Sequence, residues 1–202
     1  KEIGDFAEEL MQISFKHLTD STDGWFTGFP SPGTVSWKMA PRLVNNREVV
    51  SAGAQLTASL ALLRMYELTG KEIYRSKGID LSTRVMSAAY DSIRGCWFDA
   101  FERQAPYTIG DTSSVTWWLQ SYGSLIQLHL YNITQERRYL NSFNKMASFW
   151  DNYFVDRSYG GVYQAVSPAG VPLITGKAVA WKASYHEMEN ALLNYFYLNL
   201  EE

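Results

Sequence analysis

The side chains best able to do chemistry gather near the C-terminal end of the chain, around His186. Histidine exchanges a proton near neutral pH, so it can act as a general acid or base without a large shift of its pKa. Lys177, Trp181 and Lys182 come shortly before it. A histidine on a helix face with one ordinary hydrogen bond would give the same pattern, so residue type alone leaves both interpretations open.

Aromatic residues are abundant: the 202 residues include seven tryptophans, thirteen tyrosines and ten phenylalanines. A protein core uses many such rings, but a surface on which a planar or sugar-like ligand stacks would use them as well. Trp117 and Trp118 are neighbours, so on a helix their side chains point about 100° apart. We therefore expect one of them in the core and the other in the lining of a pocket.

Composition and charge argue against several classes of partner. The formal net charge is −3 and no basic stripe is present, so no nucleic-acid ligand is expected. No apolar stretch approaches about 18 residues, which argues against a membrane span. The three histidines are far apart and Cys96 is the single cysteine, so no metal, organic cofactor or disulfide is expected. The N-terminal residues, with Glu8 and Lys16, do not resemble a signal peptide, which favours a cytoplasmic location.

An internal repeat of 65 residues organises the chain. Tyr66, near the end of one apolar helical pattern, returns as Tyr131. Other matched pairs are Gln55 with Gln120, Leu63 with Leu128, Asp91 with Asp156, and Gly95 with Gly160. Units made of two helices stack on one another, as in a helical toroid or solenoid.

Helical spacing of apolar residues, together with helix-stop signals, predicts six helices. Their expected ranges are 3–18, 50–69, 72–90, 114–132, 136–154 and 181–199. Long loops near 24–48, 95–112 and 157–179 connect them, and we expect these loops to carry function or to cover one end of the fold. Short hairpin strands are expected in the last two loops. No linker rich in proline, glycine and serine divides the sequence, so residues 1–202 are expected to form a single helical domain.

Three motifs resemble those of the N-acylglucosamine 2-epimerase superfamily, which includes cellobiose 2-epimerases and aldose–ketose isomerases. Residues 181–186 resemble the family pattern Trp-Lys-x-x-Tyr-His, and this is the most specific of the three. Residues 156–163 resemble its Asp-x-x-Tyr-Gly-Gly-Trp turn. Residues 117–120 resemble its paired tryptophans before a glutamine.

The resemblance implies an all-α fold of the (α/α)6-toroid type, in which helical hairpins close into a ring around a sugar pocket. The number of predicted helices corresponds to about half of such a ring, and the motifs belong to its C-terminal half. The remainder is then expected from a missing N-terminal half or from a second chain. A homodimer is one form that such a pairing could take.

The resemblance also implies chemistry on a mono- or oligosaccharide. Enzymes of this type move the proton next to the carbonyl of an open-chain sugar, and His186 is the implied acid–base group. Substrate-binding roles are implied for Trp117, Trp118 and Trp181 as stacking surfaces, for Lys177 and Lys182 as sources of charge, and for Gln120.

The sequence departs from the family pattern at two places. The family carries a second histidine in a Gly-His-x-x-Glu pattern, whereas Ala54 and Thr57 stand at the matching positions here. Ser121 and Tyr122 replace a family Ala-Glu pair. Alanine cannot transfer a proton, so the two-histidine mechanism is incomplete within this chain. Another base, a base from the missing half, and a sugar-binding relative without catalysis all remain open.

A glycoside hydrolase of the six-hairpin type is the main alternative function. Such enzymes usually place two carboxylic acids on either side of the scissile bond. Asp99 and Asp111 lie in or beside the long central loop, where such an acid would sit.

Overall fold

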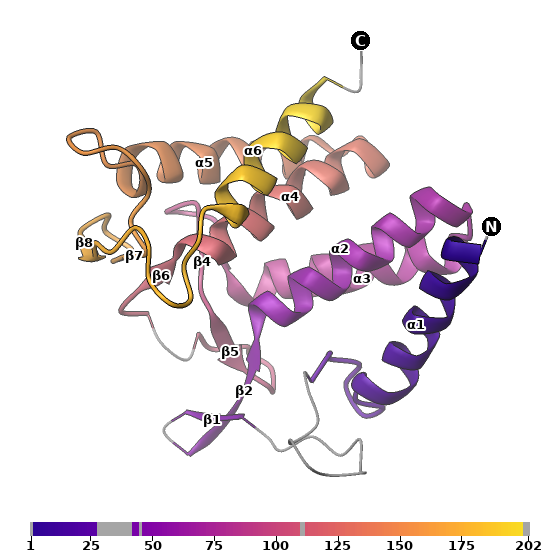
Figure 1. Ribbon diagram of the computed structural model, residues 1–202. Helices are drawn as coiled ribbons and strands as arrows, with labels where there is room; N and C mark the ends of the chain where they lie inside the picture. The colour runs from indigo at the N-terminus through magenta and orange to yellow at the C-terminus, as the bar shows by residue number, and fades with distance from the viewer. Residues whose placement is uncertain (1, 28–41, 45, 110–111, 200–202) are drawn as a thin grey trace. The chain divides into compact units, whose positions relative to one another are not determined.

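The structure is a computed structural model that describes residues 2–27, 42–44, 46–109 and 112–199. These residues form six α-helices, a short π-helix and eight short strands (Figure 1). The helices are α1 (Glu2–Leu18), α2 (Ala52–Thr69), α3 (Glu72–Ala89), α4 (Trp117–Thr134), α5 (Arg137–Phe149), the π-helix η1 (Trp150–Phe154) and α6 (Tyr185–Leu198). The six predicted helices are thus confirmed, although α6 begins four residues later than expected.

The strands make the all-α expectation incomplete, because the connections between the helices form small antiparallel sheets. One sheet has the order β1-β2-β5, a second pairs β3 with β4, and the third has the order β6-β7-β8. The strands are β1 (Arg42–Val44), β2 (Arg47–Ser51), β3 (Tyr90–Asp91), β4 (Cys96–Trp97), β5 (Ala100–Glu102), β6 (Val115–Thr116), β7 (Ala165–Val166) and β8 (Pro172–Ile174).

The described residues fall into two compact units. The first lies within residues 1–88 and 100–110, and the second within residues 89–99 and 111–202. The single domain expected over residues 1–202 stays a prediction. All of the predicted site residues belong to the second unit.

The first unit is built on the hairpin of α2 and α3. Leu56, Leu62 and Leu63 are fully buried along α2. The two helices approach closely at Gly78, where an added Cβ would lie 2.6 Å from Leu63 Cδ2. A side chain at this position would therefore force α2 and α3 apart.

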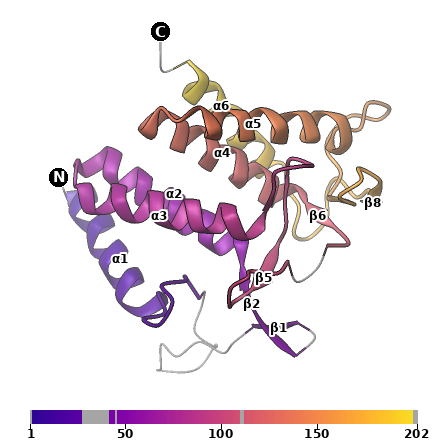
Figure 2. The same ribbon diagram turned by 180° about the vertical axis from the view of Figure 1, so that it is seen from behind.

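The second unit is built around α4, which packs against both α5 and α6 (Figures 1 and 2). Twelve of its residues are buried, so α4 is covered on most of its circumference. Strand β4 also approaches α4 closely, because an added Cβ at Gly123 would lie 2.1 Å from Trp97 Nε1. This central helix carries several of the candidate site residues on its first turns.

The repeat seen in the sequence has a counterpart in three similar turns. In each turn an aspartate side chain accepts a hydrogen bond from the backbone N–H two residues later, at 2.7–2.9 Å. A glycine at the fourth position after it then adopts a φ of 71–81°. The aspartates are Asp20, Asp91 and Asp156, and the glycines are Gly24, Gly95 and Gly160. The repeated aspartates therefore close turns, which is a structural role.

Replacing Gln135 with glycine is expected to stabilise the second unit by about 0.5–1 kcal/mol. Gln135 ends α4 in the left-handed conformation, with φ 58°, whereas its repeat partner Gly70 ends α2 with φ 68°. A side chain costs free energy in this conformation, and part of the gain on removing it is offset by the greater entropy of glycine in the unfolded chain. Urea unfolding of Gln135→Gly measures the change, and the reverse substitution Gly70→Gln should lower stability. An unchanged or lowered stability of Gln135→Gly would contradict the expectation.

Candidate functional site

His186 lies in the first turn of α6 and is only 8% exposed. Four aromatic rings surround its imidazole. Three of them come from the first turns of α4, which packs beside α6. The distances between ring centroids are 5.4 Å to Tyr122, 6.0 Å to Trp117, 6.2 Å to Trp118 and 3.8 Å to the adjacent Tyr185. A titratable group is thus held in an aromatic environment.

Burial lowers the pKa of His186 below its ordinary value, because the charged imidazolium loses its hydration. The carboxylates of Glu189 and Glu187 oppose this shift. Within the described part of the chain, His186 Nδ1 is buried and has no hydrogen-bond partner. At neutral pH the ring is therefore mainly uncharged, and it can accept a proton.

Lys182 is almost fully buried beside this histidine, but its charge is already paired. Its Nζ lies 2.5 Å from Glu187 Oε1. The ammonium group also lies 5.4 Å from the centre of the Trp117 ring, a favourable cation–π arrangement. Lys182 thus contacts both Glu187 and Trp117, and its role as a source of charge for a ligand stays a prediction.

Lys177 is placed by a second ion pair. Its Nζ lies 2.5 Å from Asp156 Oδ2, and it lies 5.7 Å and 5.9 Å from the ring centres of Tyr159 and Tyr163. The hydrogen bond from Lys177, together with those from the backbone N–H groups of Tyr159 and Ser158, lowers the pKa of the Asp156 carboxyl to about 2.

The Asp156–Lys177 pair predicts a loss of stability in strong acid. The folded-state pKa of Asp156 is lowered from 3.8 to about 2, so the contribution is present above pH 4 and is lost as the pH falls toward 2. Lys177→Met should move the carboxyl pKa back toward 3.8, because its largest cause is removed. NMR of the Asp156 side-chain carboxyl against pH measures both values. A pKa of 3.8 in the unmodified protein would contradict the ion pair.

Gln120 was predicted to contact substrate, and in the structure its amide bonds to the protein backbone. Gln120 is completely buried, its Oε1 accepts from the backbone N–H of Trp97 at 2.8 Å, and its Nε2 donates to the carbonyl oxygen of Trp97 at 2.9 Å. Its repeat partner Gln55 holds the backbone N–H and carbonyl of Phe26 in the same way. Gln120 therefore anchors β4 to α4, and its amide is occupied by the protein backbone.

The three predicted stacking tryptophans have different surroundings. Trp117 is buried, as expected for a core ring, and Trp118 is half-buried. The role of Trp118 in lining a pocket stays a prediction. Trp181 is 87% exposed and lies before the start of α6. Tyr122 and Tyr185 were not predicted as site residues. Tyr122 lies one helical turn after Trp118, and that spacing is the signal that could have identified it.

The other candidate positions give little support for further catalytic groups. Asp99 accepts a hydrogen bond from Thr116 Oγ1 at 2.7 Å, and Asp111 lies outside the described residues. Ala54 lies in the first turn of α2, in the first unit.

No group of three or more His, Cys, Asp or Glu side chains suited to a metal ion occurs among the described residues. In the same part of the chain, no helix combines the length and the apolar character that crossing a membrane requires.

The chain was compared with known proteins. No protein-family model matches it, and no curated protein matches it. Solved structures do match. A cellobiose 2-epimerase from Bacillus thermoamylovorans has a TM-score of 0.77 at 18% identity, covering 96% of this chain and 47% of its own. A D-mannose isomerase has a TM-score of 0.77 at 19% identity, covering 95% of this chain and 50% of its own.

The chain shares the fold of these two enzymes. The resemblance found in the sequence motifs is thus confirmed at the level of the fold. A glycoside hydrolase family 76 mannosidase from Bacteroides thetaiotaomicron is also similar, with a TM-score of 0.68 at 14% identity, covering 98% of this chain and 48% of its own. The chain spans about half the length of the structures it matches.

Proposed function

We propose that this chain carries the proton-transferring part of a carbohydrate epimerase or aldose–ketose isomerase, with His186 as the acid–base group. The observation that carries the proposal is the imidazole of His186, buried among four aromatic rings with its pKa lowered. The fold shared with a cellobiose 2-epimerase and a D-mannose isomerase supports the choice of substrate class.

In the proposed reaction, the neutral imidazole of His186 accepts the proton from C2 of an open-chain aldose. Trp118, which is half-buried, offers a ring face to the apolar side of the sugar. Burial raises the pKa of Tyr122, so its phenol keeps its proton and can donate a hydrogen bond to the enediolate oxygen. Return of the proton to the other face of C2 gives the epimer, and return to C1 gives the ketose.

Return of the proton to the other face needs a second acid–base group. Ala54 stands where the resemblance implies a histidine, and alanine cannot supply the proton. We propose that this group comes from the part that completes the ring, either a longer form of the polypeptide or a second chain. A protein that binds sugar and does not transform it is the outcome expected if no such group is supplied.

One side of α6 carries exposed apolar residues, and this supports the proposal that another segment or chain covers it and completes the ring. Tyr185, Met188, Leu192 and Tyr195 are all more than half exposed, and their 3-4-3 spacing forms one apolar stripe along the helix. The opposite side of α6 uses polar residues toward α4, where Asn194 Nδ2 donates to Ser124 Oγ at 3.1 Å. Sedimentation of the protein and of Leu192→Glu distinguishes a second copy, which the substitution would remove, from an additional segment.

Incubation with aldoses in deuterated water tests the proposed function. Glucose, mannose and cellobiose are the first panel, and deuterium at C2 together with the epimer or ketose is the expected result. A glycoside hydrolase is the second candidate, favoured by the fold shared with a mannosidase, and it would raise the number of reducing ends without labelling C2. Saturable sugar binding without deuterium incorporation would contradict catalysis and would favour the binding relative.

A further inference from the structure

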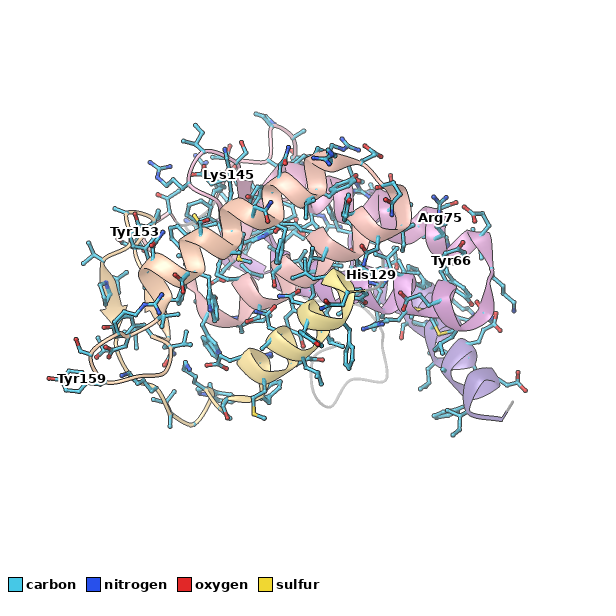
Figure 3. All side chains as sticks on the ribbon, turned by 90° about the horizontal axis from the view of Figure 1, so that it is seen from above. Tyr66, Arg75, His129, Lys145, Tyr153 and Tyr159 are labelled. Carbon is cyan, nitrogen blue, oxygen red and sulfur yellow. The ribbon has the colours of Figure 1, made fainter. Side chains whose placement is uncertain are left out.

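A pocket of about 400 Å³ lies in the second unit and shares no lining residue with the aromatic group around His186. It is formed by α5, by the π-helix η1 and by the turn between β3 and β4. The lining residues that matter chemically are Arg94, Asn144, Lys145, Phe149, Asn152 and Tyr153. Figure 3 shows Lys145 and Tyr153 along the same edge of α5 and η1.

One wall of the pocket is fixed by close backbone packing. The turn between β3 and β4 approaches α5 so closely that an added Cβ at Gly95 would lie 2.8 Å from the carbonyl oxygen of Lys145. Lys145 Nζ donates to the carbonyl oxygen of Ser92 at 2.8 Å. Nearby, Tyr90 Oη donates to the carbonyl oxygen of Ser142 at 2.9 Å. These three contacts hold the turn against α5, and Arg94 and Lys145 both line this part of the pocket.

The aromatic end of the pocket is fixed as well. Tyr153 belongs to η1, and π-helical turns are rare and occur frequently at functional sites. An added Cβ at Gly170 would lie 2.1 Å from Tyr153 Cδ1, so the turn at Gly170 packs directly on this ring. The ring also packs edge to face on Phe149, at 5.0 Å between centroids. Tyr153 is nevertheless 41% exposed, so it offers a rigid aromatic surface to a ligand.

The polar lining is rich in donors. Lys145 supplies a positive charge that its carbonyl partner Ser92 does not neutralise. Arg94 is ion-paired with Asp91 through Nη1 at 2.6 Å, and it contributes its remaining N–H donors. The side chains of Asn144 and Asn152 are exposed and belong to the lining. None of the described residues that line the pocket is acidic. Two cationic side chains, one of them paired with Asp91, thus line one space together with two amides and an aromatic ring.

We propose that this pocket is a second ligand site, which binds a sugar unit carrying an anionic group, either a carboxylate or a phosphate. Arg94 and Lys145 bind the anion, since guanidinium and ammonium groups recognise carboxylate and phosphate oxygens. The amides of Asn144 and Asn152 bind the hydroxyl groups. Tyr153 packs against the apolar face of the sugar ring, as aromatic side chains do at many binding surfaces. The volume agrees with one sugar unit, because ligand pockets begin at about 300 Å³.

NMR titration of the full chain tests this proposal independently of turnover. The probes are glucuronate, glucose 6-phosphate, glucose and inorganic phosphate, and the readout is the set of backbone amide shifts together with the affinity. One of the two anionic sugars is expected to shift residues 93–94 and 144–153 and to bind at least tenfold more tightly than glucose. Glucuronate and glucose 6-phosphate together decide which anion is preferred.

Substitutions identify the groups that act. Lys145→Met and Tyr153→Ala are each expected to weaken binding of the anionic sugar at least fivefold, and Lys145→Arg is expected to restore most of it. His186→Gln is expected to leave this binding unchanged, which separates the pocket from the proposed catalytic site. Equal binding of glucose, binding of inorganic phosphate as tight as that of the sugar, or anionic-sugar affinity that Lys145→Met and Tyr153→Ala leave unchanged would each overturn the proposal. A circular dichroism spectrum equal to that of the parent protein ensures that the variants are folded.

Discussion

His186→Gln is expected to lower proton exchange at sugar C2 by at least about 10²-fold, because an amide cannot accept the proton that the imidazole takes. Glutamine is close to histidine in size, so the surrounding rings of Tyr122 and Trp118 keep their contacts. His17→Gln is the matched control, since His17 lies in α1 of the first unit and plays no part in the proposed chemistry. Both variants are compared with the parent protein by deuterium incorporation into the same aldose. Full exchange by a folded His186→Gln would remove His186 from the mechanism.

The protonation of His186 is expected to determine how kcat/KM depends on pH. The pKa of His186 is lowered below 6.5 by burial, and the base must be uncharged, so kcat/KM should be constant near neutrality and fall as the pH drops below the lowered pKa. Stability should change in the same direction. The unfolded chain takes up the proton at a higher pH than the folded chain, so the folded state loses stability as the pH falls below 6.5. A rate that rises below pH 6 would indicate that the charged imidazolium is the active form.

Gln120→Leu is expected to destabilise the second unit by about 2–4 kcal/mol. Leucine fills a similar volume but leaves the backbone N–H and carbonyl of Trp97 buried without their partners, and each such group costs about 1–3 kcal/mol. Gln55→Leu should have a similar effect in the first unit, where the partner is Phe26. Urea unfolding followed by circular dichroism measures both changes.

Gln104→Leu is the control for this pair, since Gln104 is exposed and its replacement should change stability by less than about 0.5 kcal/mol. The alternative to be distinguished is the substrate-binding role expected for Gln120 from the sequence. A Gln120→Leu protein that is as stable as the parent, and has lost sugar binding, would restore that role and would contradict the anchoring of β4.

The helices were predictable because their signals are local. Gly70 ends α2 in the left-handed conformation, and the repeated Asp91 and Asp156 close turns with the backbone directly after them. The start of α6 was predicted too early because Val179 and Lys182 pair with each other, each donating its N–H to the other's carbonyl. That pairing competes with the helix over residues 181–184, and periodicity does not reveal it.

The site was less predictable because its contacts join distant segments. The motif singled out His186, whose catalytic role stays a prediction, and the neighbouring tryptophans could be found from their position on a predicted helix. The backbone contacts of Gln120 are with a strand that lies 23 residues earlier in the chain, and the motif did not reveal them. Tyr122 was noted only as a departure from the family pattern, although its ring lies against His186. The polar contacts of α6 likewise follow from its packing on α4, which sequence spacing does not specify.

The measurement that tests the central claim most directly is NMR of the His186 imidazole during a sugar titration. Nitrogen-15 signals of the ring, assigned with His186→Gln, give its pKa and report on ligands that approach it. We predict a pKa below 6.5 in the free protein and ring signals that move with saturable dependence on mannose or cellobiose. An ordinary pKa of 6.5, in a folded protein whose His186 signals no aldose moves, would contradict the claim that the aromatic enclosure of His186 is a sugar site.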